Sequence, residues 1–235
     1  TPTLTFNTVT ALGTTQISAI KTDPNNSNTV WVGGSGSGNP VILKLTNANI
    51  GIPTATTTAT ITGAGWYVSS IDVEKDNSNH VLVTFSNYGV TSVYESINGG
   101  TSWTAIEGNL VDMPVRWGIF LPSGSNEGVI ALATELGVFT TTATNGGTTS
   151  WVSNNSGFPK VRTDMLKYRP SDNTLVAATH GRGIFSTTIG ITAVTWNGSG
   201  GNSWTTPSNW TPSRVPGITD EVIIPNVGTL PIITT

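Results

Sequence analysis

The most informative stretch of the sequence is Ser96-Ile97-Asn98-Gly99-Gly100-Thr101-Ser102-Trp103. A short side chain with an acceptor oxygen can bond the backbone N–H groups of such a turn, and glycine adopts the positive φ angles at which a Cβ would clash. The final tryptophan carries a large apolar ring that can pack between neighbouring sheets. A second copy, with one more residue before its tryptophan, is Thr144-Asn145-Gly146-Gly147-Thr148-Thr149-Ser150-Trp151.

Both segments belong to a pattern that recurs four times along the chain. Each repeat contains an alternating strand, a polar turn, a second strand of continuous apolar residues and a third strand. The second strands begin at Val30, Val81, Val129 and Leu175, which places successive repeats 51, 48 and 46 residues apart. A period near fifty residues with three or four strands per repeat is the size of a propeller blade.

The two glycine-rich segments resemble the Asp box, with the pattern S/T-x-D-x-G-x-S/T-W, which joins the third and fourth strands of blades in sialidases, sortilin-like receptors and xyloglucanase-type propellers. Asn98 and Asn145 stand where the family usually has aspartate, so the acceptor oxygen is kept and the charge is lost. This loss argues against a strong cation site at these turns. The resemblance assigns structural box roles to Ser96, Asn98, Gly100, Trp103, Asn145, Gly147 and Trp151.

The resemblance implies an all-β chain: a partial β-propeller of about four blades, each a four-stranded antiparallel sheet, followed by a small β module. We place the propeller blades in residues 1–190 and the start of a second, Trp-rich module in residues 191–235. The stretch Thr179-His180-Gly181-Arg182-Gly183-Ile184-Phe185 is similar to the closing blade of such propellers. We therefore expect the C-terminal part of a larger propeller, with missing blades or a partner chain at the open edge.

The tail contains three tryptophans, Trp196, Trp204 and Trp210, within fifteen residues. Their arrangement is similar to a module of large secreted Bacteroidetes surface proteins that carry type IX secretion signals. This resemblance implies an extracellular or bacterial cell-surface location. The three rings are candidates for contact with a ligand by stacking on sugars, and the alternative is that they pack the core of the module.

Composition excludes several classes of function. Charged residues make up only 10% of the chain, against roughly 25% in typical proteins, and the net charge is −3. Without a basic stripe we expect no nucleic-acid partner. No apolar run approaches the ~20 residues that span a bilayer, so we expect no membrane span. The chain has no cysteine and two histidines, and we expect no metal site and no cofactor.

Carboxylates are the candidates for glycosidase chemistry, which needs a pair about 5–10 Å apart across a cleft. We single out Asp72 and Asp164 because both lie in or near first strands, which line the central channel of a propeller. The alternative is that they satisfy backbone groups or turns. The full set of main carboxylate candidates is Asp72, Asp112, Asp164, Glu95, Glu107, Glu127 and Glu135.

Most of the chain serves blade architecture, and paired carboxylates are scarce. We therefore expect a non-catalytic, secreted or cell-surface binding or adhesion module that contacts glycans or proteins. Two alternatives stay open. One is a glycoside hydrolase of the xyloglucanase type with its active site partly outside this segment, and the other is a structural spacer or assembly subunit.

Overall fold

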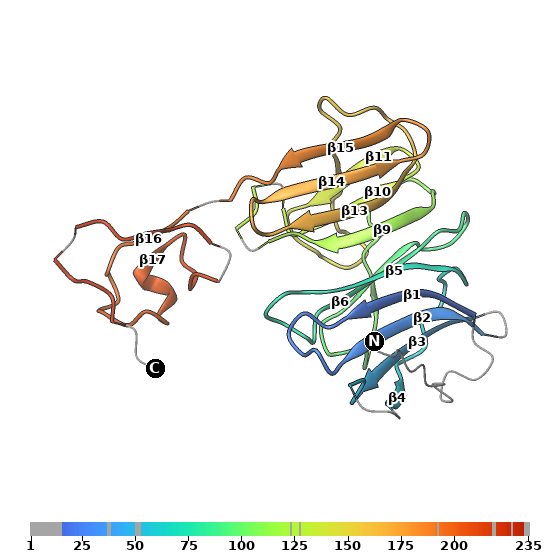
Figure 1. Cartoon of the computed structure of the whole chain (residues 1–235), viewed down its shortest axis with the longest axis horizontal. Coiled ribbons are helices and arrows are strands. Elements are labelled where there is room, and N and C mark those ends of the chain that lie inside the picture. The colour runs from blue at the N-terminus through green and yellow to red at the C-terminus, as the bar shows by residue number, and fades with distance from the viewer. Residues whose placement is uncertain are drawn as a thin grey trace, which may run out of the picture.

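A computed structural model shows an all-β chain with blade-like sheets, as expected from the sequence (Figure 1). No helix among the described residues has both the length and the apolar character needed to cross a membrane. The residues that the structure describes are 16–36, 39–49, 53–122, 124–126, 128–191, 193–217, 220–226 and 228–232.

Three sheets have four strands each, and in every one the strands follow each other in chain order with antiparallel pairing. The first sheet contains β1 (Gln16–Thr22), β2 (Val30–Gly36), β3 (Asn39–Thr46) and β4 (Thr54–Thr57). The second contains β5 (Val68–Val73), β6 (Val81–Phe85), β7 (Val93–Ser96) and β8 (Thr104–Ala105). The third contains β9 (Val115–Phe120), β10 (Ile130–Thr134), β11 (Gly137–Thr141) and β12 (Val152–Ser153).

The fourth sheet differs from the expected four strands. Its described strands are β13 (Thr163–Arg169), β14 (Thr174–Thr179) and β15 (Gly183–Thr188). The described residues that follow β15 form no box turn. Ile189 is buried, and the carbonyl of Gly190 accepts a hydrogen bond from Asn126 N at 2.7 Å. This contact directs the chain toward the tail module.

The tail forms a small separate sheet in the order β17-β16-β18. Its central strand β16 pairs antiparallel with β17 and parallel with β18. Its elements are β16 (Val194–Trp196), the short 3-10 helix η2 (Pro207–Asn209), β17 (Trp210–Thr211) and β18 (Val222–Ile223).

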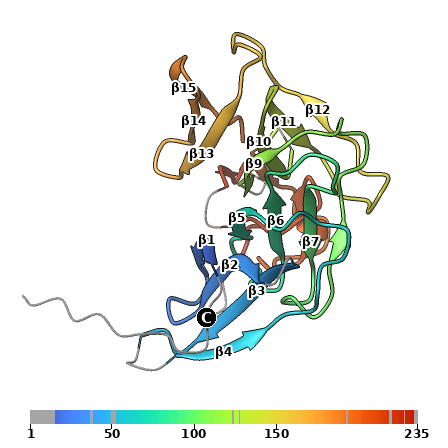
Figure 2. The same cartoon turned by 90° about the vertical axis from the view of Figure 1, so that its right-hand side faces the viewer.

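The first strands of the four large sheets lie side by side: β5 contacts β1 and β9, and β9 contacts β13. In Figure 2 the first and third sheets run outward from β1 and β9 to β4 and β12. Glycine permits two of these close approaches. A Cβ on Gly33 would lie 2.6 Å from Val68 Cγ1, and a Cβ on Gly118 would lie 2.8 Å from Leu82 Cδ2, both in the neighbouring sheet.

Apolar side chains pack between each pair of neighbouring sheets. Trp31 of the first sheet belongs to one cluster with Phe85 of the second, Leu82 of the second to a cluster with Leu132 of the third, and Leu166 of the fourth to a cluster with residues of the third. Every residue of β6 and β10 is buried. Burial on both faces explains the continuous apolar runs that mark the second strands in the sequence.

The first box turn has the hydrogen bonds that its sequence indicates. Ser96 Oγ accepts from Gly100 N at 2.8 Å, and Asn98 Oδ1 accepts from Ser102 N at 2.9 Å. Gly99 and Gly100 have φ angles of 65° and 85°, which only glycine adopts without strain. The half-buried Trp103 then extends back to the first sheet, where its Nε1 donates to Thr58 Oγ1 at 3.4 Å.

The second box turn is built differently from the expectation for Asn145 and Gly147. Asn145 contributes its backbone N–H, which donates to Thr149 Oγ1 at 2.8 Å, so a threonine supplies the acceptor oxygen. The positive φ of 52° belongs to Gly146 and not to Gly147. The extra residue before Trp151 lengthens the turn and accounts for this shift.

Trp151 occupies the same place between sheets as Trp103. It is 4% exposed, and its Nε1 donates to the carbonyl of Ile106 at 2.8 Å. Substitution Trp151→Ala would leave a cavity between the second and third sheets and should lower the free energy of unfolding by about 3–5 kcal/mol. Val152→Ala, at an exposed neighbour, should change it by less than about 1 kcal/mol. Urea unfolding followed by circular dichroism measures both, and equal effects would contradict the packing described.

Candidate functional site

Asp72, one of the two carboxylates singled out from the sequence, is buried in β5 as part of a contact between sheets. Its Oδ1 lies 2.5 Å from Lys21 Nζ of β1, and its Oδ2 accepts from Phe120 N of β9 at 2.7 Å. Burial raises the pKa of Asp72, although the charge and hydrogen bond of Lys21 act in the opposite direction. These contacts connect three first strands. They match the alternative stated above, in which Asp72 satisfies backbone groups.

Asp164, the second candidate, lies at the start of β13 and is half-exposed. Arg162 Nε donates to its Oδ1 at 2.7 Å, and His180 Nδ1 lies 3.6 Å from its Oδ2. Asp164 is the second residue of its first strand, whereas Asp72 is the fifth residue of a first strand two sheets away. The two carboxylates are therefore offset from each other by about 10 Å along the strand direction, at ~3.3 Å per residue. The distance across two sheets adds to this separation. The structure does not bring the two carboxylates together as a catalytic pair.

The three tail tryptophans pack on one another. Trp196 and Trp210 are each 1% exposed, and the ring of Trp210 meets those of Trp196 and Trp204 edge to face at 4.9 and 4.8 Å. Trp196 Nε1 donates to Thr229 O and Trp210 Nε1 donates to Trp204 O. Trp196 and Trp210 therefore offer no free ring face to a sugar, and only the half-buried Trp204 retains partial exposure.

Three exposed aromatic side chains lie instead in loops at the ends of strands of the second sheet. Trp66, Tyr67 and Tyr88, here called the aromatic surface, are 60%, 53% and 65% exposed. Backbone contacts hold the two segments together: Tyr67 O accepts from Ser86 N at 3.3 Å, and Asn87 Oδ1 accepts from Tyr67 N at 3.2 Å. The three rings thus project from adjoining loops where β5 begins and β6 ends.

A polar hollow of about 430 Å³ lies in the neighbouring loops, and Gly89, the residue after Tyr88, is among its lining residues. Glu107 and Asp112 are among the residues that line it, and Asp112 Oδ1 accepts from Gly89 N at 2.7 Å. Burial raises the pKa of Glu107; the hydrogen bond from Ser92 N lowers it, and the charge of Asp112 raises it further. The hollow therefore offers carboxylate acceptors in loops that follow Tyr88 directly in the chain.

Glu107 and Asp112 were predicted only as members of a general set of carboxylates, and the aromatic surface was not predicted. These aromatic residues lie between the predicted strands, where periodicity gives no signal. The available signal is that large aromatic residues occur within polar, glycine-containing loops, namely Gly65-Trp66-Tyr67 and Asn87-Tyr88-Gly89.

His80 forms a second cluster of ionisable groups, in the second sheet. Its Nδ1 lies 2.9 Å from Glu74 Oε2, its Nε2 lies 2.9 Å from Glu95 Oε2, and its ring contacts that of Phe120. Burial opposes the positive charge on His80, but the hydrogen bonds and charges of Glu74 and Glu95 outweigh burial and raise the pKa to about 9. Within the described ranges, no group of three or more His, Cys, Asp or Glu side chains is arranged to hold a metal ion.

Comparison with known proteins places the fold. The GH74 enzyme of Niastella koreensis matches with a TM-score of 0.56 and 19% identity over 73% of this chain and 28% of that chain. An ancestral GH74 enzyme matches with a TM-score of 0.51 and 17% identity over 77% of this chain and 26% of that chain. The β-propeller domain of Cps50 (Swd1) from Myceliophteria_thermophila gives a TM-score of 0.46 at 12% identity, over 77% of this chain and 58% of that domain.

The chain thus spans about a quarter of the length of the two GH74 enzymes. No family model matches the sequence, and no curated protein matches it. At these identities the comparisons establish the fold alone: blade-like, four-stranded antiparallel sheets similar to those of the GH74 enzymes, together with a small additional sheet.

The His80 cluster makes stability depend on pH. A folded-state pKa of about 9, above the ordinary 6.5, means that the contribution of charged His80 is fully present below pH 6.5 and is lost as the pH rises through about 9. The difference in unfolding free energy between the natural chain and His80→Gln should therefore shrink over this interval. Urea titrations at several pH values measure the difference. A constant difference over this pH interval would contradict the assignment.

Proposed function

We propose that the chain is part of an Asp-box β-propeller from a secreted or cell-surface protein and that it binds glycans without catalysis. The observation that carries the proposal is the aromatic surface, formed by Trp66, Tyr67 and Tyr88. Large aromatic side chains are costly to leave in water, and an exposed group of them is typical of a binding site. The low charge of the chain, 10% charged residues, favours a neutral partner over a charged one.

The chemistry of the aromatic surface and the adjoining hollow fits a carbohydrate. The flat face of an aromatic ring can cover the apolar C–H face of a sugar, and carboxylate oxygens accept hydrogen bonds from its hydroxyl groups. Glu107 and Asp112 line the hollow together with Gly89, which directly follows Tyr88, so we infer that one ligand can make both kinds of contact. The contacts of Asp72 and Asp164 with cationic partners support a non-catalytic role for those two residues.

A glycoside hydrolase is the second candidate, and one observation favours it. A glycosidase needs a carboxylic acid with a raised pKa close to a second carboxylate. Burial and the nearby charge of Asp112 raise the pKa of Glu107 in this way. The hydrolase hypothesis therefore now centres on Glu107 and Asp112. A spacer or assembly subunit would show neither glycan binding nor turnover.

Binding can be measured with neutral β-glucans, including xyloglucan, by affinity electrophoresis and on a glycan array. Tyr88→Ala or Trp66→Ala should weaken binding about tenfold, which corresponds to ~1.4 kcal/mol for the loss of one stacked ring. Ile97→Ala, which removes an exposed apolar side chain from the first box turn, serves as the matched control and should leave binding unchanged. Retention that is equal in all variants, or absent in the natural chain, would contradict the proposal.

Release of reducing sugar from the same glucans separates binding from hydrolysis. The binding proposal predicts no release by the natural chain at acidic or neutral pH, where a protonated acid and an ionised carboxylate can coexist. Release that Glu107→Gln abolishes while binding persists would replace the proposal with the hydrolase alternative.

A further inference from the structure

The outer edge of β15 differs from the outer edges of the other third strands. In the second and third sheets a two-residue fourth strand, β8 or β12, pairs with the third strand. In the fourth sheet, none of the described residues pairs with the outer side of β15. Ile184 of this strand is 74% exposed, and most of its other residues are exposed as well.

The β15 edge matches the edge that β11 uses to bind its fourth strand. Two third-strand segments pair with their second strands in the same register, namely Gly137-Val138-Phe139-Thr140 and Gly183-Ile184-Phe185-Ser186. In both, the side chain of a threonine on the second strand donates to the glycine carbonyl, at 2.9 Å in β11 and 2.7 Å in β15. Phe185 therefore corresponds to Phe139, which pairs with Ser153 of β12.

The fourth strands β8 and β12 are each preceded by a tryptophan that is seated against the preceding sheet. Trp103 Nε1 donates to Thr58 Oγ1 and Trp151 Nε1 donates to Ile106 O. Thr58 and Ile106 are equivalent, because their N–H groups donate to the third-strand carbonyls of Ile42 and Val93, each at 3.0 Å.

Asn154 is the residue of the third sheet that is equivalent to Thr58 in the first and Ile106 in the second. Its N–H donates to the third-strand carbonyl of Val138 at 2.8 Å. By the same rule, a tryptophan from the fourth sheet would be seated beside Asn154. No tryptophan of the described ranges follows β15 in the fourth sheet, since the next is Trp196 in the core of the tail module.

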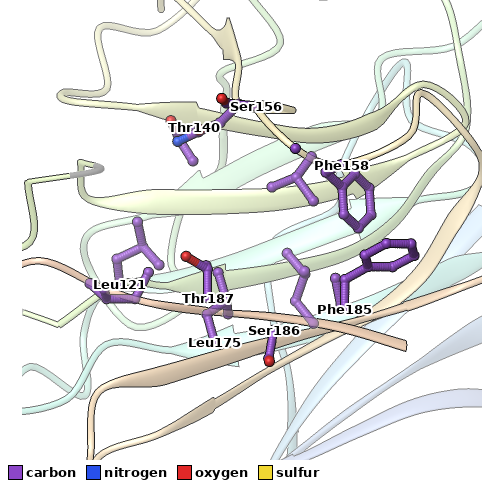
Figure 3. Close-up of a pocket in the computed structure, with 14 residues that line it drawn as sticks. Leu121, Thr140, Ser156, Phe158, Leu175, Phe185, Ser186 and Thr187 are labelled. Atoms are coloured by element: carbon purple, nitrogen blue, oxygen red, sulfur yellow. The ribbon is translucent and has the colours of Figure 1, made fainter. Parts of the chain in front are cut away.

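A cavity of about 240 Å³ lies at this position, between the third and fourth sheets (Figure 3). Phe158 and Phe185 stand at one side of it, with their rings edge to face at 4.9 Å. Phe139, the counterpart of Phe185, belongs to the cluster that surrounds Trp151. The cavity is mainly apolar, with Val138, Leu166, Leu175, Ala177, Phe158 and Phe185 among its lining residues.

We propose that this cavity and the free edge of β15 together form a docking site for an extended polypeptide strand that carries a tryptophan. The main chain of the strand would pair with β15, and the indole would enter the cavity beside Asn154, as Trp151 does beside Ile106. Addition of a strand to an open edge with side-chain pockets is an established mode of peptide recognition. In a second copy of this chain the two tryptophans that precede a fourth strand, Trp103 and Trp151, are engaged in their own sheets, and the exposed Trp66 precedes β5, which is paired within its own sheet. The strand is therefore assigned to a different polypeptide.

The backbone geometry identifies a substitution that blocks the edge. Val138 directs both main-chain groups outward, since its N–H donates to Asn155 Oδ1 at 2.9 Å and its carbonyl accepts from Asn154 N. Alternate residues of a strand point the same way, so the N–H groups of Ile184 and Ser186 face outward on β15. Proline at 186 removes an outward donor, which an edge strand tolerates.

The probe is a fluorescent peptide with the sequence of residues 146–154, which contains the second tryptophan and β12. Titrated with the full 235-residue chain, it should bind saturably by fluorescence anisotropy. A peptide with alanine in place of the tryptophan, and the chain variant Ser186→Pro, should each weaken binding at least about tenfold, as expected for loss of an anchor residue or of main-chain pairing. Ser186→Ala should bind within about twofold of the natural chain, because it keeps the N–H.

Circular dichroism checks that Ser186→Pro is folded, and Ala177→Phe, which fills the cavity from its wall, gives an independent block. The proposal is overturned by absence of saturable binding, by equal binding of the two peptides, or by unchanged binding to both blocking variants. Competition by N-acetyltryptophanamide as effective as that of the unlabelled peptide would also overturn it, since the cavity would then recognise a small aromatic molecule and not a strand.

Discussion

The apolar face that each sheet presents to the next is the contact on which the other features of this chain depend. Single sheets of this size bury too little surface to be stable alone, so neighbouring sheets must cover one another. The inner strands add polar contacts between sheets. Ser18 Oγ donates to Val68 O at 2.7 Å, and Ser69 Oγ, 51 residues later, donates to Val115 O at 2.6 Å. The repeat in the sequence is therefore a repeat of contacts between sheets.

This constraint also determines where a binding site can lie. Polar groups near the inner strands, Asp72 above all, connect neighbouring sheets. The loops at the strand ends are free of that requirement, and loops on a rigid scaffold commonly carry function. Trp66, Tyr67 and Tyr88 occupy such loops, which is why the aromatic surface and its adjoining hollow form the candidate site.

The sequence predicted the repeated sheets well because period and polarity report burial directly. Continuous apolar runs marked β6 and β10, and the serine, asparagine and glycine of the first box predicted its turn. The three-stranded fourth sheet was not predictable, since a fourth strand such as β8 or β12 has two residues and carries no pattern of its own. The role of Thr149 depends on one inserted residue, and exposure of the loop aromatics depends on tertiary packing.

Hydrogen exchange at two backbone amides tests most directly whether neighbouring sheets pack on one another. The amides of Gly118 and Phe120 donate to Ser70 Oγ and Asp72 Oδ2 of the neighbouring sheet, at 2.8 and 2.7 Å. If the sheets pack as described, both amides should exchange as slowly as those within the β9–β10 ladder. Rapid exchange at both, with the ladder still protected, would show that the second and third sheets do not cover one another and would contradict the account.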